Sequence, residues 1–203
     1  MITLGIDTSL NDVSFAIVEN TSVFAEFNDN TGRNLVDKIS GVFINLFEKA
    51  NIRINDIERC GIVVGPGSFT GLRIGIAFAK GLFADSDVKF APVSSLECIA
   101  GSSGKTGNIS VISDARQDEV FFARFNNESE FVRICEDVRI PFEEALKRCA
   151  ENDNIIYSTE AANLAKNRGV IAAKIAVESK NLMTINDIFP NYMQVSYAER
   201  RGK

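Results

Sequence analysis

A short apolar strand that runs directly into a glycine-rich turn and a helix restricts the fold of this chain most strongly. Residues 60–64 (Cys-Gly-Ile-Val-Val) form a continuous apolar run, typical of a strand that is covered on both faces of a parallel sheet. The turn at residues 65–71 follows, and residues 72–83 then show helical spacing. Because parallel strands need crossover connections, this unit predicts an α/β protein with helices packed on a sheet.

Two helices are expected in the first half of the chain. In residues 34–51, apolar side chains recur at helical spacing and form a broad apolar face. The helix at residues 72–83 is rich in small residues, namely Gly75, Ala77, Ala79 and Gly81. Since a glycine inside a helix costs about 1 kcal/mol relative to alanine, we expect this helix to pack closely against another element.

A β-hairpin at the N-terminus is loosely repeated in the second half. Residues 1–18 alternate as two strands around a polar tip at 7–12, and residues 109–125 do the same around a tip at 113–118. A third strand at 23–27, a strand at 88–93 and a helix at 94–100 complete a βββαβα order in the first half. The repeat predicts a duplicated unit.

A Gly/Ser-rich segment at residues 101–107 marks a predicted domain boundary. We expect an N-terminal lobe at 1–103 and a smaller C-terminal lobe at 104–203, whose last helical segment could pack back on the first lobe. The elements expected in the second lobe after its hairpin are a strand at 131–134, a helix at 142–150, a strand at 155–157, a helix at 160–167 and a strand at 173–177.

The composition excludes several classes of catalytic site. The 203 residues contain no histidine, so the chain cannot by itself form a Ser-His-Asp triad, a Cys-His dyad or a zinc site of the His-Glu-x-x-His type. Any chemistry must use carboxylates, lysine, backbone amides or a partner. The net charge of −5 argues against unaided binding of nucleic acid, because phosphate contacts need clustered Lys and Arg.

Cysteine usage and hydropathy predict a cytoplasmic protein without membrane contact. The four cysteines lack C-x-x-C spacing and are expected to be reduced residues of the core. No apolar run approaches the roughly 20 residues of a membrane span. The first residues show neither a basic region nor a long apolar stretch of the kind that directs secretion.

The glycine-rich turn at residues 65–71 is a candidate anion site, because backbone N–H groups and the helix dipole meet between a strand and a helix. Its G-x-G-x-x-x-G spacing differs from the dinucleotide fingerprint, since Thr70 stands where that pattern needs glycine. A tight turn that binds nothing explains the glycines equally well. Residues 104–106 (Gly-Lys-Thr) lack the upstream glycine of a P-loop, because Ile99 holds that position.

The two hairpin tips carry further polar clusters. The Asp-Thr-Ser sequence at residues 7–9 could present a carboxylate and hydroxyls to phosphate or magnesium, or could form a simple Asx-type turn. Asp114, Asp118 and Glu119 could bind a metal, or could form a surface cluster that Arg116 neutralises. The sequence leaves both alternatives open.

Three blocks of the sequence resemble the TsaB/YeaZ family, a bacterial component of the machinery that makes tRNA threonylcarbamoyladenosine (t6A). These are Leu-Gly-Ile-Asp-Thr-Ser at 4–9, Gly-Pro-Gly-Ser-Phe-Thr-Gly-Leu-Arg-Ile-Gly at 65–75, and Asp-Ala-Arg at 114–116, followed by Glu119 and Val120. The resemblance is close through the N-terminal half, weak in the middle of the second lobe, and extends to Pro190 and Tyr192.

The resemblance implies an actin-like ATPase or ribonuclease H-like α/β fold, with two βββαβα-type lobes whose mixed sheets are flanked by helices. It implies an accessory subunit that is neither a catalyst nor a protease. Such a subunit binds and activates TsaD, which transfers the threonylcarbamoyl group to N6 of adenosine 37 in ANN-decoding tRNAs. TsaE is the further implied partner, and tRNA binds only within the complex. The chain would be a homodimer when alone.

The resemblance also implies which residues carry these roles. The family pairs through two helices of the first lobe, so the implied partner contacts are Leu35, Ile39, Val42, Phe43, Leu46, Gly75, Ala79 and Phe83. No catalytic residue, metal ligand or cofactor of its own is implied, although ATP or ADP could be shared at the partner interface. The candidate phosphate contacts are Asp7, Thr8, Ser9, Gly65, Gly67, Ser68 and Gly71. The sequence departs from the family pattern at Thr31, Asp118 and Gln194, which bears on nucleotide contacts more than on fold or partner.

A second hypothesis is an autonomous ATP-dependent enzyme or nucleotide-binding protein of the actin-like class. In it, Asp7 and the turn at 65–71 would hold phosphates, and Asp114 would assist Mg²⁺. Nucleotide hydrolysis by the isolated chain distinguishes the two hypotheses.

Overall fold

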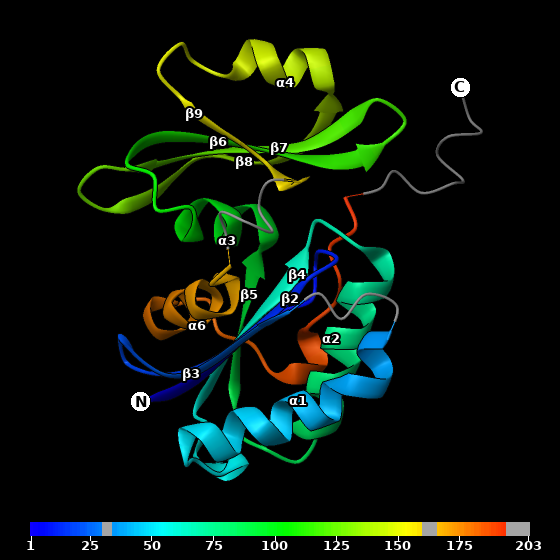
Figure 1. Cartoon of the computed structure of the whole chain (residues 1–203), viewed down its shortest axis with the longest axis vertical. Helices are drawn as coiled ribbons and strands as arrows, with labels where there is room; N and C mark the ends of the chain where they lie inside the picture. Colours follow the sequence, from blue (N-terminus) through cyan, green and yellow to red (C-terminus); the bar gives the residue numbers. More distant parts are fainter. Residues whose placement is uncertain (30–33, 160–165, 194–203) are drawn as a thin grey trace.

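Two β-sheets lie on either side of a pair of helices (Figure 1). The computed structural model describes residues 1–29, 34–159 and 166–193. The first sheet has the strand order β3-β2-β1-β4-β5, and the second has the order β8-β7-β6-β9. Both sheets are mixed, because the hairpins are antiparallel whereas β1 with β4, β4 with β5, and β6 with β9 are parallel.

The strands of the first sheet are β1 (Ile2–Asp7), β2 (Val13–Glu19), β3 (Ser22–Asp29), β4 (Arg59–Gly65) and β5 (Lys89–Ser94). The strands of the second sheet are β6 (Gly107–Arg116), β7 (Glu119–Asn127), β8 (Phe131–Pro141) and β9 (Asn154–Tyr157). Two short 3-10 helices, η2 (Ile54–Asp56) and η3 (Ile185–Asp187), lie in connections.

Helices cover both faces of the first sheet. The helices α1 (Leu35–Ala50) and α2 (Phe69–Leu82) pack on one face, and α6 (Arg168–Glu178) packs on the other against β1, β2 and β4. The helix α3 (Ser95–Ser102) lies between α6 and the second sheet, whose far face α4 (Phe142–Arg148) covers (Figure 1). The helix α6, which lies late in the chain, thus covers one face of the sheet that the first strands of the chain form.

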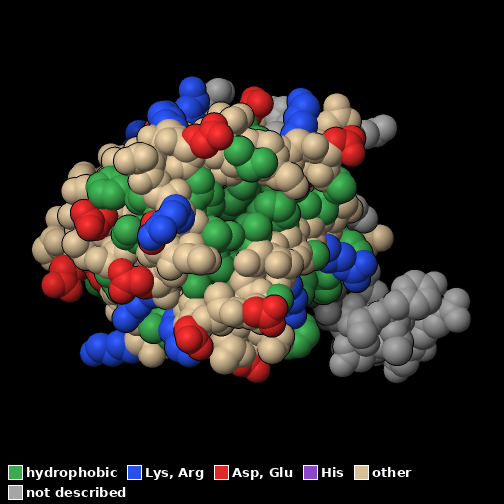
Figure 2. Space-filling view, turned by 90° about the horizontal axis from the view of Figure 1, so that it is seen from below, with side chains coloured by type: hydrophobic (Ala, Val, Ile, Leu, Met, Phe, Trp, Pro, Cys, Tyr) green, Lys and Arg blue, Asp and Glu red, His purple; other side chains and the backbone are tan. Residues whose placement is uncertain are grey.

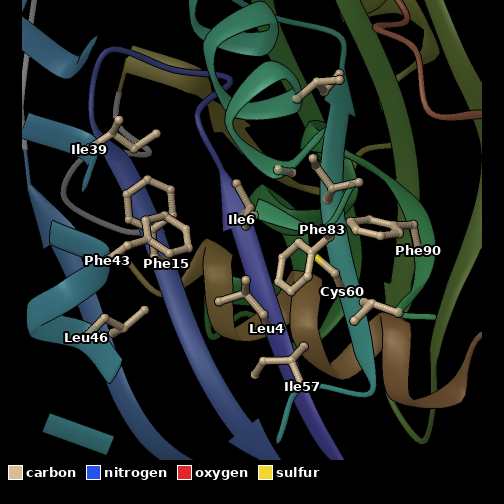
Figure 3. Packing of buried hydrophobic residues seen from close by; sticks show 14 of the residues in the cluster. Leu4, Ile6, Phe15, Ile39, Phe43, Leu46, Ile57, Cys60, Phe83 and Phe90 are labelled. Atoms are coloured by element: carbon tan, nitrogen blue, oxygen red, sulfur yellow. The ribbon is translucent and has the colours of Figure 1, made fainter. Parts of the chain in front are cut away.

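The main core lies between the first sheet and the helices α1 and α2 (Figure 3). Ile39, Phe43 and Leu46 of α1 point toward Phe15 of β2, and the ring centroids of Phe15 and Phe43 are 4.9 Å apart. Because these side chains lie on one face of an amphipathic helix, burying each of them contributes about 1.5–3 kcal/mol and fixes α1 on the sheet. The second sheet has its own clusters, centred on Phe125 and on Phe122.

Most predicted elements are confirmed, with shifted bounds. The strands of both hairpins and the helices expected near 34–51, 72–83, 94–100 and 142–150 all form. The helix α2 begins at Phe69 because the hydroxyl of Ser68 accepts a hydrogen bond from the Gly71 amide and caps it. The strand β8 continues to Pro141, beyond the expected 134.

One expected element is wrong. The strand predicted at 173–177 is part of α6, in which alanines and other small residues at helical spacing face the first sheet. Alanine favours helix, and this preference outweighs the short apolar run. The helix predicted at 160–167 falls mostly outside the described residues, and the division into lobes at 103 stays a prediction. No helix in the described ranges is long and apolar enough to cross a membrane.

Candidate functional site

The first half of the first hairpin tip, residues 7–9, is buried at the carboxyl end of β1. Asp7 and Ser9 are fully buried, and Thr8 is 2% exposed. One oxygen of the Asp7 carboxylate, Oδ1, accepts hydrogen bonds from the Ser9 amide at 2.8 Å and from the Ser9 hydroxyl at 2.6 Å. The Asp-Thr-Ser sequence therefore folds as the Asx-type turn that was one of its two interpretations.

The other oxygen of Asp7 is paired with a buried arginine. The Nε of Arg168, the first residue of α6, donates to Asp7 Oδ2 at 2.6 Å, and its Nη1 donates to Asp12 Oδ2 at 3.0 Å. Nη2 also donates to the backbone oxygen of Asp12 at 2.9 Å. Burial alone would lower the pKa of the Arg168 guanidinium, but the carboxylates of Asp7 and Asp12 outweigh it and raise that pKa. The arginine therefore stays charged and neutralises the tip.

The glycine-rich turn packs against the same hairpin tip. The Ser68 amide donates to the backbone oxygen of Ser9 at 2.7 Å, and the Thr8 hydroxyl donates to that of Gly71 at 2.8 Å. A Cβ atom at Gly67 would clash with the Ser9 carbonyl oxygen, and one at Gly71 would clash with that of Thr8. Glycines at these two positions let the backbones of turn and tip approach each other.

The structure thus brings all seven candidate phosphate contacts together at the carboxyl ends of β1 and β4. The hydrogen bonds described above join Asp7, Thr8 and Ser9 to Arg168 and to the turn, so these polar groups are engaged within the chain. Ser9, Gly67 and Ser68 border a neighbouring cleft. Phosphate binding by these residues stays a prediction.

This cleft has a volume of about 970 Å³ and lies between the first hairpin tip, the start of α2 and the end of β6. Its polar lining includes the carboxylates of Asp12, Asp29 and Asp114 together with Lys166. Asp12 is one of the two carboxylates that Arg168 neutralises, so its charge is compensated within the chain. The cleft therefore combines acidic, basic and hydroxyl groups.

The second hairpin tip does not gather its three acidic residues into a metal site. Glu119 forms an ion pair with Arg139 at 2.6 Å, Asp118 lies in the exposed turn, and Asp114 borders the cleft. Among the described residues, no group of His, Cys, Asp or Glu has a geometry that could hold a metal ion. Glu119 is therefore neutralised by Arg139, and neutralisation of the cluster by Arg116 stays a prediction.

A second hollow lies on the outer side of α1 and α2. It has a volume of about 710 Å³, and Phe43, Phe47 and Phe78 are part of its mainly apolar lining. Figure 2 shows apolar side chains gathered in a hollow in the middle of this face, with charged side chains around it. We call this hollow the α1–α2 groove; its further lining residues are Ser40, Ile44, Glu48, Asn51, Ile52, Arg53, Ile54 and Leu82.

The structure buries most of the residues that were expected to contact a partner through these helices. Six of the eight expected contacts are at most 5% exposed and pack inside the chain: Leu35, Ile39, Phe43, Leu46, Ala79 and Phe83. Gly75 is also buried, against the Thr8 side chain, and Val42 is half-buried against the core. The apolar periodicity identified the face of each helix that meets the sheet. Val36 and Ile44 of α1 point outward and are 63% and 59% exposed, and partner contact at the eight expected positions stays a prediction.

Comparisons with known proteins agree with this architecture. The family model described as "TsaD: tRNA N6-adenosine threonylcarbamoyltransferase" matches residues 27–197, most of the chain. The chain belongs to the TsaD family. Two relatives carry the name tRNA threonylcarbamoyladenosine biosynthesis protein TsaB. The Bacillus subtilis protein is 28% identical over 155 residues, 75% of this chain and 68% of the relative. The Haemophilus influenzae protein is 28% identical over 216 residues, 97% of this chain and 86% of the relative.

Within the TsaD family, the chain is of the TsaB/YeaZ type. The solved structure of YeaZ from Pseudomonas aeruginosa superposes with a TM-score of 0.78 at 18% identity, covering 94% of this chain and 99% of that chain. The predicted α/β fold of the actin-like class, with mixed sheets flanked by helices, is confirmed. Of the departures from the TsaB/YeaZ pattern, Thr31 and Gln194 lie outside the described residues. Asp118 has a φ of 60°.

Sequence reasoning missed Arg168, which the TsaB/YeaZ resemblance did not include. Its two carboxylate partners are 161 and 156 residues away in the sequence, and no local pattern signals such a pair. The one available signal is a lone arginine at the start of the apolar run of α6. Of the four cysteines expected in the core, Cys60 and Cys98 are fully buried, and burial raises the pKa of both thiols, whereas Cys135 and Cys149 are only partly buried.

Proposed function

We propose that the chain is a non-catalytic partner subunit in the biosynthesis of tRNA threonylcarbamoyladenosine, acting in the cytoplasm with a TsaD-type threonylcarbamoyltransferase. Two kinds of similarity support this proposal. The relatives from Bacillus subtilis and Haemophilus influenzae are named as t6A biosynthesis proteins, and the matching family model is that of the transferase.

The pairing of Asp7 with Arg168 is the observation that carries the non-catalytic part of the proposal. Asp7 stands at the end of β1, where a carboxylate facing the cleft could bind a magnesium ion or a proton. Here it is fully buried, and one oxygen is engaged by Ser9 and the other by Arg168. A carboxylate held in this way has little capacity left for a substrate or an ion. The sequence also has no histidine to replace it.

The α1–α2 groove supports the pairing part of the proposal. Phe47, Phe78 and Ile44 contribute apolar surface to it, and Glu48 and Arg53 lie among its lining residues. An exposed apolar hollow with polar residues at its edge is typical of a surface that a protein partner covers. We place the TsaD-type subunit on this groove. A second copy of the chain would cover it when the partner is absent.

Reconstitution tests the proposal directly. TsaC, TsaD, TsaE, ATP, threonine, bicarbonate and tRNA are combined with and without the chain, and t6A is measured by mass spectrometry of digested tRNA. We expect product only with the chain, together with co-elution of the chain and TsaD in gel filtration. Product formed equally well without the chain would refute the proposal.

A matched pair of variants tests the groove. Ile44→Asp places a charge in it at a residue that is 59% exposed, whereas Val132→Asp places one on β8 at a residue that is 51% exposed. We expect Ile44→Asp to abolish co-elution and product, and Val132→Asp to leave both unchanged. Equal effects of the two charges would contradict the groove as the partner site.

The remaining parts of the proposal concern nucleotide and the other partners. TsaE is the proposed third component, tRNA binds within the complex, and ATP or ADP would be shared at the partner interface. The isolated chain is expected not to hydrolyse ATP. Hydrolysis that disappears in an Asp114→Asn variant would favour the autonomous enzyme instead, since Asp114 borders the cleft.

A further inference from the structure

A group of aromatic and basic side chains lies along one flank of α2, beside the segment that contains η3 and continues to residue 193. We call it the aromatic–basic stripe; its members are Phe69, Arg73, Lys80, Phe189 and Tyr192. Figure 1 shows this late segment, in orange and red, running next to α2. The stripe has no role in the site or the groove described above, apart from Phe69, which borders the cleft.

The members of the stripe contact one another in two sets. The guanidinium carbon of Arg73 lies 3.7 Å from the ring centroid of Phe69, and Arg73 Nε donates to the Tyr192 hydroxyl at 2.7 Å. The rings of Phe69 and Tyr192 are stacked with centroids 4.5 Å apart. In the second set, Lys80 Nζ lies 4.5 Å from the ring centroid of Phe189. Cation–π contacts thus hold positive charges directly beside aromatic rings.

Ring surface in both sets remains accessible. Phe69 is 40% exposed and Phe189 is 67% exposed. The Arg73 guanidinium carbon also lies 5.6 Å from the Tyr192 ring centroid. The exposed part of Phe69 therefore offers surface to a further flat group, next to a guanidinium that Tyr192 already holds.

The charge of α2 contrasts with that of the whole chain. The helix carries two basic residues, Arg73 and Lys80, and no acidic one, whereas the chain as a whole has a net charge of −5. Accessible rings that alternate with fixed positive charges match the chemistry of unpaired nucleotides, whose bases stack on aromatic rings and whose phosphates need cations. An acidic peptide would use the charges but not the flat rings.

The stripe is separate from the α1–α2 groove. Phe78 and Leu82 of α2 line the groove, whereas Phe69, Arg73 and Lys80 recur at spacings of four and seven residues and so share another flank of the helix. A partner on the groove would leave this flank accessible.

We infer that the aromatic–basic stripe binds unpaired nucleotides of RNA by stacking bases on Phe69 and Phe189 beside Arg73 and Lys80. This deepens the proposed function, and it rests on that function only in identifying the RNA as the tRNA whose anticodon loop is modified. The chain would then hold part of the substrate as well as the partner.

Fluorescence anisotropy with a labelled RNA stem–loop tests the inference, first with the isolated chain at about 0.05 M salt, where phosphate contacts are strongest. The probe is compared with a fully paired RNA duplex of the same length. We expect tighter binding of the stem–loop, and a loss of affinity of about tenfold in Phe69→Ala and in Phe189→Ala. Phe24→Ala, which removes another phenylalanine that is 40% exposed, is the control and should bind as the unchanged chain does.

The substitution Arg73→Lys separates stacking from charge. Lysine keeps the positive charge but lacks the planar guanidinium, so we expect weaker binding with an unchanged salt dependence. Equal affinity for stem–loop and duplex, or an equal loss in Phe24→Ala, would overturn the inference.

The complex with TsaD distinguishes this inference from the proposed function. Stripe variants that co-elute with TsaD but bind the stem–loop more weakly support both. Variants that lose TsaD and keep RNA binding would show that the stripe contacts protein, and would overturn the inference. If the unchanged chain fails to bind TsaD while the stem–loop results hold, the proposed function fails and the stripe stands.

Discussion

The two hairpin tips of this protein arise from similar sequence patterns but have different environments. The first tip, after β1, is buried at residues 7–9, which Arg168 and the glycine-rich turn hold in place. The second tip, between β6 and β7, is an exposed two-residue turn at Gln117 and Asp118, with φ values of 58° and 60°. A repeated pattern thus specifies the hairpin, and the elements that pack on its tip decide what the tip can do.

Each sheet also has an arginine–aspartate pair, which is fully buried in the first sheet and partly buried in the second, and the two pairs differ in the sequence distance that they span. Arg168 and Asp7 join segments 161 residues apart, whereas Arg124 and Asp153 join β7 to the start of β9, 29 residues later. The first pair fixes a late helix on an early sheet. The second fixes a local connection within its own sheet.

Removing the buried cation beside the first tip should cause the largest loss of stability among these predictions. Arg168→Met leaves Asp7 buried without its counter-charge, and we expect a loss of about 3–5 kcal/mol in the free energy of unfolding. Arg139→Met, which removes the pair with the partly exposed Glu119 at the second tip, should cost about 1 kcal/mol. Urea denaturation followed by circular dichroism measures both, and similar losses at the two tips would contradict the difference between them.

Adding a methyl group where the glycine-rich turn meets the first hairpin tip should cause the next largest loss of stability. We expect Gly71→Ala to lower the free energy of unfolding by about 2–3 kcal/mol, because the new Cβ would clash with the Thr8 carbonyl. The control is Gly81→Ala in the same helix, where no atom lies within 4 Å, and it should stabilise the protein by about 0.5–1 kcal/mol. If thermal denaturation shows that both alanine substitutions stabilise the protein, the backbone around Gly71 and Thr8 can move apart to make room for the new methyl group.

The pair in the second sheet should show a pH dependence. Burial opposes the charged form of Asp153, but hydrogen bonds from Arg124, Ser110 and the Ala150 amide outweigh it and lower its pKa. A lowered carboxyl pKa stabilises the fold above the unfolded value of about 3.9, and this contribution is lost as pH falls below it.

The variant Asp153→Asn isolates that contribution. It should cost about 2 kcal/mol near neutral pH, and the difference from the unchanged chain should shrink toward pH 3. Urea midpoints at the two pH values provide the measurement. A constant difference between them would mean that the charge of Asp153 is not what stabilises the connection.

The smallest expected effect is a gain at the second tip. Asp118 has a left-handed backbone conformation, which glycine adopts without the steric cost of a Cβ atom. Asp118→Gly should therefore raise the free energy of unfolding by about 0.5–1 kcal/mol, as thermal denaturation would show. Asp118→Ala, which keeps a Cβ, should give no gain, and a gain from alanine as large as that from glycine would argue against the conformational explanation.

Local patterns in the sequence predicted most of the fold. The period of two in the hairpins, the apolar face of α1 and the strand–turn–helix unit around β4 each identified an element, because each depends on residues close in the sequence. The segment of α6 was read as a strand because its small apolar residues suit either structure. Its packing on the first sheet, far along the chain, decides that it is a helix.

The candidate site was predictable in part. The Asp-Thr-Ser tip and the turn at 65–71 were both identified, and the structure brings them together. Their meeting depends on the parallel pairing of β1 with β4, which follows from the fold class. Most of the expected partner contacts are buried within the chain, because an apolar helix face marks what the helix buries, whether its own sheet or another chain covers it. Only the packing of α1 and α2 decides that Phe43 is 3% exposed and Ile44 is 59% exposed, although both line the α1–α2 groove.

The sequence by itself determined the hairpins, the helices of the first half and the lack of histidine chemistry, since these follow from composition and from short-range periodicity. The tertiary structure alone decided that Asp7 is neutralised by Arg168 and that Phe69, Arg73 and Tyr192 form one surface. Apart from the contact of Phe69 with Arg73 within α2, those contacts join residues more than a hundred positions apart, and no local preference encodes them. They form because packing the last segments on the first sheet buries apolar area and brings the charges within hydrogen-bonding distance.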